Sequence, residues 1–228
     1  MENSNGLAQA KAVFSEINKW GAAEKIEAMC FNTTAANTGC WKGTCTLLEQ
    51  YFEKHLLYLA CRHHILELLL KAVFESKFGA TTGPQPEMFK KFQMKWPVLD
   101  KKQYKFGIED LLVKIHFSDL EEISGFLLNQ LEQKHPREDY KEFLLLCLIF
   151  LGRVSPDKIS FRAPGAIHHA RWMAIYSLKI YIFRQEFSLT PSELESIRSL
   201  CIFILKIYVK HWFTAPDAAT APNNDLQL

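Results

Sequence analysis

The feature that most constrains the fold is an alternation of helical and strand-like segments over residues 7–78. Apolar residues repeat at helical spacing over 7–20, and a loosely alternating stretch over 25–31 ends at turn-forming residues. A second helical pattern spans 43–54, and the apolar run 56–60 is short enough for a fully buried strand. This order is typical of a parallel sheet with crossover helices.

The rest of the chain predicts helices. After a Thr/Gly/Pro loop, helical patterns separated by prolines or turns cover 87–96, 108–133, 137–152, 166–187 and 191–213. Thr190 and Glu193 begin the last of these with the residues of a capping box. The predicted class is therefore α/β and predominantly helical. Two strands are too few for a stable sheet, so they form part of a larger one.

Composition narrows the classes of protein. With 48% apolar residues the chain can bury a hydrophobic core. Its net charge of +2 is too small to predict nucleic-acid binding from overall charge alone. The apolar run from Phe143 to Leu151 is about half of what a bilayer-spanning helix needs. Six cysteines are scattered without a compact framework, which favours reduced thiols and an intracellular protein. We expect neither a membrane partner nor a small-molecule substrate.

Three short stretches, taken in order, carry a resemblance to a known family. They are residues 29–39, with Asn32 in the acid position of a D-x-x-x-x-N pattern; the Cys-x-x-His step from Cys61 to His64; and the pair Arg171-Trp172. Their order and their strand or helix settings resemble those of hAT-type DNA transposases. The resemblance is sharpest over about residues 20–75 and 160–215.

The resemblance implies an RNase H-like core that carries an all-helical insertion. In intact members of such families, three carboxylates hold two Mg²⁺ ions, which activate water or a 3′-hydroxyl for in-line phosphoryl displacement. The implied organisation is an N-terminal helix over 1–20, a partial core over 21–78, a helical insertion over 79–215 and a linker-like tail over 216–228.

Position 32 departs from the family's pattern. Asn stands where the second catalytic acid is expected, and an amide oxygen brings no negative charge to a pair of dications. No strand that could carry the first acid is predicted before residue 20. Glu193 and Glu195, the candidates for the third acid, begin an amphipathic helix without the expected surroundings. We therefore expect no intact catalytic set, no enzymatic activity and no resident Mg²⁺.

Simpler interpretations of the same residues stay open. The alternative for Asn32 is a residue that turns or caps a strand end. Cys61 and His64 suggest a zinc site, although the spacings of the other cysteines fit no standard zinc motif. Trp172 is most simply part of a helix core.

Two groups of residues are candidates for DNA contact. They are Lys90, Lys91, Lys95, Lys101 and Lys102, which interleave with aromatic residues, and His168, His169 and Arg171. Lysines interleaved with aromatic rings can line a nucleic-acid groove. An amphipathic helix with a solvated lysine face explains the pattern as well.

The resulting functional hypothesis is a transposon-derived, catalytically inactive protein that retains DNA or partner binding. Its partners would be DNA and copies of itself or related transposase subunits, and its location would be nuclear. The alternative is a helical protein–protein interaction module, in which apolar surface left bare by missing strands docks on a partner.

Overall fold

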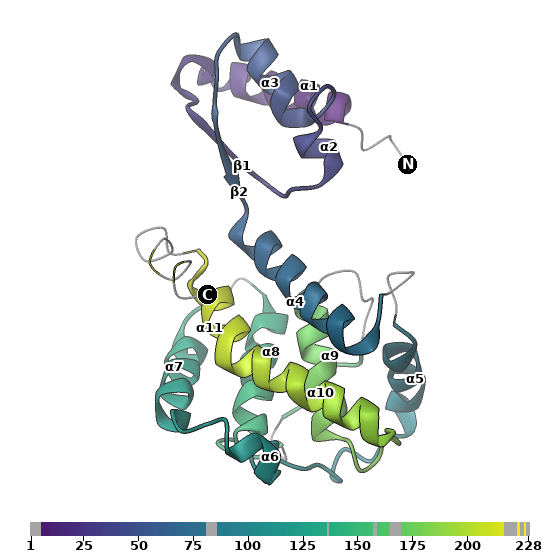
Figure 1. Cartoon of the computed structure of the whole chain (residues 1–228). Coiled ribbons are helices and arrows are strands. Elements are labelled where there is room, and N and C mark those ends of the chain that lie inside the picture. Colours follow the sequence, from purple (N-terminus) through teal and green to yellow (C-terminus); the bar gives the residue numbers. More distant parts are fainter. Residues whose placement is uncertain are drawn as a thin grey trace. The chain divides into compact units, whose positions relative to one another are not determined.

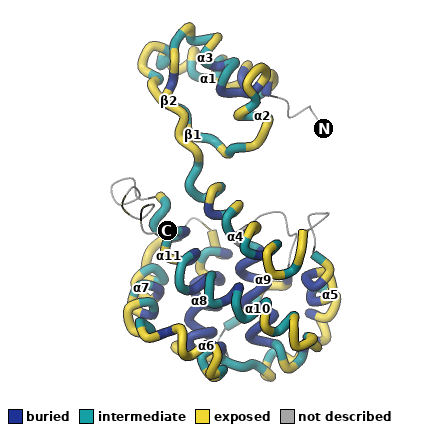
Figure 2. Tube along the Cα trace, in the orientation of Figure 1, coloured by how far each residue is buried: buried dark blue, intermediate teal, exposed yellow. Residues whose placement is uncertain are grey.

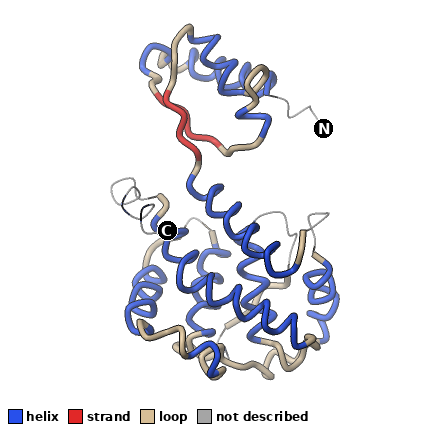
Figure 3. Tube along the Cα trace, in the orientation of Figure 1, coloured by secondary structure: helices blue, strands red, loops and turns tan. Residues whose placement is uncertain are grey.

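The computed structural model describes residues 6–80, 86–135, 137–156, 159–164 and 170–216, together with Asn223 and Leu226. The chain divides into two compact units, which we call the sheet unit (1–65) and the helical unit (66–228) (Figure 1). Helices dominate, and the strands of the described residues lie in the sheet unit (Figure 3). The predicted class, predominantly helical with a small parallel sheet, is confirmed.

The sheet unit has the predicted order of elements. Its elements are α1 (Gly6–Lys19), the 3-10 turn η1 (Ala23–Lys25), β1 (Ala28–Phe31), α2 (Ala35–Thr38), α3 (Thr44–Phe52), β2 (Leu57–Ala60) and the start of α4 (Arg62–Phe78). The first strand begins later than predicted, because η1 occupies 23–25. The short helix α2 lies in a segment whose small polar residues gave no helical pattern.

β1 and β2 pair in parallel, as the alternation predicts. Ala28 lies opposite Leu57 and Phe31 opposite Ala60. The backbone N–H of Leu57 donates to the carbonyl of Glu27 at 2.9 Å, which begins the ladder between the two strands. Parallel neighbours require a crossover connection, and α2 and α3 provide it.

The core of the sheet unit is small. Its buried apolar residues, within the described part of the unit, are Ala10, Cys45, Leu48 and Leu56. The contact between α1 and α3 adds a partly exposed aromatic cluster, in which the ring of Phe14 lies 5.2 Å from that of Tyr51 and 5.1 Å from that of Phe52. A core of this size contributes little stability to a unit of about sixty residues.

The prediction that the run 56–60 is a fully buried strand is wrong. All four residues of β2 are exposed (Figure 2). Leu56 before the strand is buried, but Leu57 keeps 68% of its surface accessible. Strands of parallel sheets have apolar residues on both faces because both faces are normally covered. Here Glu49 of α3 contacts one side, and nothing within the described residues of the sheet unit covers the other.

The helical unit begins inside α4. Leu66, Leu70 and Phe74 of this helix are buried in the main hydrophobic core, so the division between the units falls at residue 65, earlier than the predicted boundary after 78. The later elements are α5 (Glu87–Lys95), the 3-10 turn η2 (Trp96–Val98), α6 (Leu111–Lys114), α7 (Leu120–Glu132), α8 (Glu138–Phe150), α9 (Ala170–Ile182), α10 (Pro191–Phe203), the π-helical segment η4 (Ile204–Tyr208) and α11 (Val209–Thr214).

Two helices form the centre of the helical unit. α9 packs against both α8 and α10, and α8 packs in turn against α7. Each of these two helices has a long stretch that is buried without interruption. The stretches are residues 173–183, in and just after α9, and residues 146–151, in and just after α8. A helix that is apolar all round is a buried helix, which is why neither segment shows a clear amphipathic pattern.

The prediction of a single helix over 108–133 is wrong. Residues 115–119 turn the chain, and Phe117 is buried at the turn while α6 and α7 lie on either side of it. Both helices begin after an aspartate, at Asp110 and Asp119. None of the helices in the described part of the chain is long and apolar enough to cross a membrane.

Candidate functional site: a strand-end pair and a lysine face

The parallel register brings two of the motif residues to the same end of the sheet. Because Phe31 pairs with Ala60, Asn32 and Cys61 each follow the last paired residue of a strand. The backbone N–H of Cys61 donates to the carbonyl of Phe31 at 2.9 Å, which extends the ladder by one residue. Carboxyl ends of adjacent parallel strands gather at one edge of a sheet, which is why these two residues lie side by side.

The side chain of Asn32 organises the turn that follows β1. Its Oδ1 accepts hydrogen bonds from the Thr34 backbone N–H at 3.1 Å, from the Thr34 hydroxyl at 2.6 Å and from Asn37 Nδ2 at 2.9 Å. Asn37 Nδ2 also donates to the Asn32 carbonyl at 3.2 Å. Asn32 therefore turns the strand end, and Thr34 follows as the residue before α2.

Cys61 joins the sheet to α4 through its backbone. Its carbonyl accepts the first helical hydrogen bond, from the Ile65 N–H at 3.1 Å, and its side chain is half-buried like that of His64. Among the described residues, no group of three His, Cys, Asp or Glu side chains lies close enough to hold a metal ion. A zinc site at Cys61 and His64 thus has no third ligand in that part of the chain.

The lysines of α5 form an exposed face. Lys90, Lys91 and Lys95 are exposed, and Lys91 Nζ lies 3.5 Å from Glu87 one turn earlier. The aromatic residues that interleave with them point the other way: Phe89 and Phe92 are fully buried. The helix is an ordinary amphipathic one, so its aromatic rings are not available for bases to stack on.

The two following lysines differ from each other. Lys101 Nζ donates to the carbonyls of Trp96 and Leu99, both at 3.2 Å, and lies 4.9 Å from the centre of the Trp96 indole. It closes the C-terminal end of η2 as a structural cation. Lys102 is exposed and extends the set of solvent-accessible lysines.

The Arg-Trp motif is partly described. Trp172 is half-buried and packs against the main core, as expected for a helix-core residue. Arg171 belongs to α9, but its side chain lies outside what the structure describes, and so do His168 and His169 altogether. Their proposed DNA contacts stay predictions.

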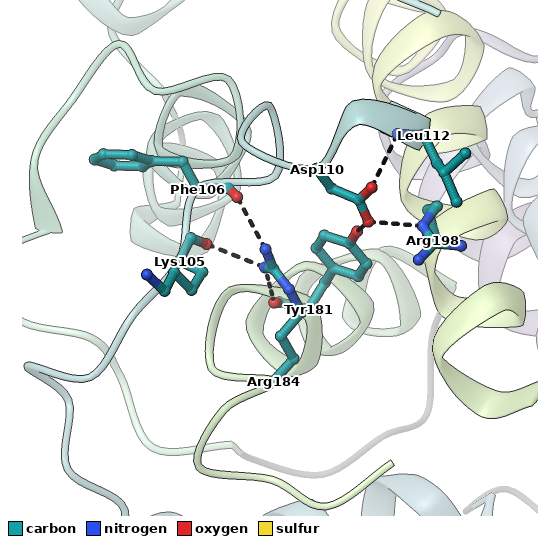
Figure 4. Close-up of polar contacts among 7 residues, drawn as sticks. All are labelled: Lys105, Phe106, Asp110, Leu112, Tyr181, Arg184 and Arg198. Atoms are coloured by element: carbon teal, nitrogen blue, oxygen red, sulfur yellow. Dashed lines mark hydrogen bonds and ion pairs between the residues drawn. The ribbon is translucent and has the colours of Figure 1, made fainter. Parts of the chain in front are cut away.

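A polar cluster centred on Asp110 was not foreseen from the sequence. The Asp110 Oδ2 accepts from the Tyr181 hydroxyl at 2.6 Å and from Arg198 Nε at 2.8 Å, while Oδ1 accepts from the Leu112 N–H at 2.9 Å (Figure 4). Burial by itself raises the pKa of the Asp110 carboxyl, but the three hydrogen bonds and the Arg198 charge outweigh it and hold the pKa below its ordinary value. The cluster joins α6, α9 and α10.

Arg184 extends the same cluster. Its guanidinium lies 4.3 Å from the centre of the Tyr181 ring and donates to the carbonyls of Tyr181, Lys105 and Phe106 (Figure 4). Its donors therefore satisfy the end of α9 and fix the segment before α6. Asp110 stands directly before α6, and an Asp in that position is a visible N-cap signal in the sequence. Its partners Tyr181 and Arg198 are far away in sequence, so the cluster itself is not visible there.

A buried ion pair fixes a second irregular segment. Lys179 of α9 and Glu142 of α8 are 1% and 6% exposed, and their Nζ and Oε1 atoms are 2.7 Å apart. Lys179 Nζ also donates to the Arg162 carbonyl, and Glu142 Oε1 accepts the Arg162 N–H. Burial lowers the pKa of Lys179, and the Glu142 carboxylate opposes that shift. Both ions hold the chain at Arg162, which is a structural role.

Comparison with known proteins adds nothing to this geometry: no family model, no curated protein and no solved structure matches the chain. A functional assignment therefore rests on the strand-end pair and the exposed lysines.

Proposed function

We propose that this protein is a DNA-binding, non-cleaving relative of hAT-type transposases, and that it acts in the nucleus. The observation that carries the proposal is the parallel pairing of β1 with β2, which sets Asn32 beside Cys61 at one edge of the sheet. This placement is what the ordered motifs of that family require.

The residues at this edge do not fit a two-Mg²⁺ site. Asn32 is neutral, and its Oδ1 already accepts three hydrogen bonds within its own turn. Loss of one carboxylate beside a pair of dications costs on the order of 4 kcal/mol, or roughly a thousandfold in rate. DNA cleavage is therefore not the activity that we assign to this chain.

DNA binding is assigned to the exposed lysines of the helical unit. Lys90, Lys91, Lys95 and Lys102 present ammonium groups to solvent on one stretch of chain, where they are able to contact phosphates. Because the neighbouring aromatic rings are buried, this face offers phosphate contacts without base stacking. We therefore expect binding that depends strongly on salt and weakly on base sequence.

Fluorescence anisotropy with a labelled DNA duplex tests the DNA-binding assignment. The triple variant Lys90→Ala, Lys91→Ala and Lys95→Ala is expected to bind at least about tenfold more weakly at low salt. Its log–log salt slope should fall by up to about 0.9 for each phosphate that the protein no longer neutralises. These side chains are exposed, so the fold should be unaffected.

The matched control removes the same charge elsewhere on the helical unit, as Lys134→Ala, Lys141→Ala and Lys210→Ala, three exposed positions. This control should bind nearly as well as the unaltered chain. Equal weakening of both triple variants, or no measurable binding to the duplex, would reject the lysine face.

A nicking assay with Mg²⁺ or Mn²⁺ tests the second half of the proposal. We expect no cleavage by the chain, and none by Asn32→Asp, which retains the oxygen acceptor of the turn but supplies one carboxylate alone. Cleavage that disappears on substitution of a single residue of this chain would overturn the assignment.

A further inference from the structure

The outer edge of β2 carries backbone groups with no neighbouring strand among the described residues. Leu57 and Cys61 direct their N–H groups to β1, each at 2.9 Å from a carbonyl oxygen. Successive residues of a strand point these groups to opposite edges, so Tyr58 and Ala60 point theirs away from β1. The sheet has the order β1-β2, which leaves this edge open to a third strand.

The outer face of the same sheet is apolar and bare. Leu56 is buried and the Tyr58 hydroxyl donates to Glu49 of α3, so this alternate set faces the helices. The other set forms the opposite face, because side chains alternate along a strand. It consists of Ala28, Cys30, Leu57 and Leu59, all exposed, with Leu57 at 68% and Leu59 at 53%.

The open edge lacks the usual protection against pairing. Natural edge strands carry charges, prolines or bulges that prevent a second strand from adding. β2 reads Leu-Tyr-Leu-Ala and has none of these in its four residues. A copy of the same strand therefore meets it without like-charge repulsion.

We propose that β2 pairs with β2 of a second copy of this chain across a two-fold axis. Such an axis normal to the sheet makes the paired strands antiparallel and keeps both outer faces on the same side. In the register that uses both outward-pointing residues, Tyr58 exchanges hydrogen bonds with Ala60 of the second copy, and Leu59 lies opposite the second copy's Leu59. The product is a sheet of four strands.

Two observations favour this occupant and this edge. Two strands fall short of the three or more that make a sheet independently stable, and one additional copy supplies two. β2 exposes large apolar side chains, whereas the outward-facing residues of β1 are Ala28 and Cys30, so pairing along β1 buries less apolar surface. Because the strand is uncharged and pairs with itself in register, a second copy is the partner that we assign to it.

Sedimentation equilibrium of the whole chain under reducing conditions tests the proposal; the reductant keeps the exposed thiols of Cys30 and Cys40 from crosslinking. We expect a reversible dimer with a dissociation constant below about 100 μM. Ala60→Pro removes an outward N–H and should weaken the dimer at least about tenfold, whereas Ala28→Pro blocks the other edge and should leave it unchanged.

A charge swap distinguishes loss of pairing from loss of folding. Leu59→Glu and Leu59→Lys are exposed substitutions, and each alone should be monomeric because like charges meet across the axis. An equimolar mixture of the two should dimerise again. A monomeric unaltered chain over this range, loss of the dimer through Ala28→Pro instead, or charge variants that dimerise unaided would each overturn the proposal.

These outcomes are independent of the proposed function. The DNA-binding variants lie in the helical unit and the dimer variants lie in the sheet unit, so failure of one set leaves the other unaffected.

Discussion

At the scale of single residues, polar side chains hold irregular segments of the helical unit in place. Asp110 caps the first turn of α6, whereas Arg184 and the pair Lys179–Glu142 bind backbone that is neither helix nor strand. Such segments have no internal ladder, so side-chain partners must satisfy their backbone groups. Ionised groups serve well here because their hydrogen bonds are stronger than neutral ones.

The Asp110 cluster gives a pH-dependent prediction. The fold lowers the pKa of this carboxyl, so its stabilising contribution is complete above the unfolded value and is lost as pH falls through the folded one. Asp110→Asn should cost about 2 kcal/mol at pH 7, and its difference from the unaltered chain should shrink below about pH 4.

Urea unfolding between pH 3 and pH 7 measures this difference. Glu109→Gln, at an exposed neighbouring position, is the control and should follow the unaltered chain throughout. A difference for Asp110→Asn that stays constant across the pH range would contradict the ionic role of the carboxylate.

Sequence patterns located some of these residues and missed others for a physical reason. Asn32 and Cys61 follow strands, and a strand end is visible from local composition. Asp110 and Arg198 are 88 residues apart and meet through packing of helices, which no local pattern contains. The lysine–aromatic pattern of α5 was compatible with two interpretations because periodicity alone does not say which face is buried.

At the scale of elements, the ends of helices were more predictable than breaks within them. The capping box at α10 is present: the Thr190 N–H donates to Glu193 Oε2 at 2.8 Å and the Glu193 N–H to Thr190 Oγ1 at 3.2 Å. The break between α6 and α7 was missed because residues 108–133 hold no proline. Ser118-Asp119 followed by two glutamates was the available signal for a helix start.

Removing the N-cap of α10 should therefore lower the stability of the fold by a measurable amount. Thr190→Ala leaves the Glu193 N–H without its partner and should lower the free energy of unfolding by about 1 kcal/mol. Thr190→Ser preserves the hydroxyl and should lose much less. Chemical denaturation of both variants makes the comparison, and equal losses would show that the methyl group, not the cap, is responsible.

At the scale of the whole molecule, the two units differ in how much core they possess. The helical unit buries long stretches of α8 and α9, whereas the sheet unit buries few apolar residues and leaves β2 exposed. The sequence predicted the strands because their composition suits a sheet covered on both faces. It could not indicate that one face would be bare, since that depends on what else is present.

Hydrogen exchange of the full chain should reveal this difference. Amides of residues 143–151 and 173–183 should be protected at least about a hundredfold more than those of 28–31 and 57–60, because local opening costs less where little surface is buried. Exchange at 57–60 should slow as protein concentration rises if β2 pairs between copies. Uniform protection along the chain would contradict unequal stability.

The π-helical segment η4 fixes how many residues the last helical stretch of the helical unit must contain. The buried positions include Cys201 before the segment, Leu205 within it and Val209 after it, a spacing of four residues. In a regular α-helix that spacing drifts by about 40° each time, and the wider turn of η4 takes up the drift. Losing one residue here would swing everything that follows by about 100°, so Trp212 would leave the interior for water. An inserted residue in a loop changes no helical register and is tolerated better, so the number of residues in this stretch is fixed while loop lengths are not.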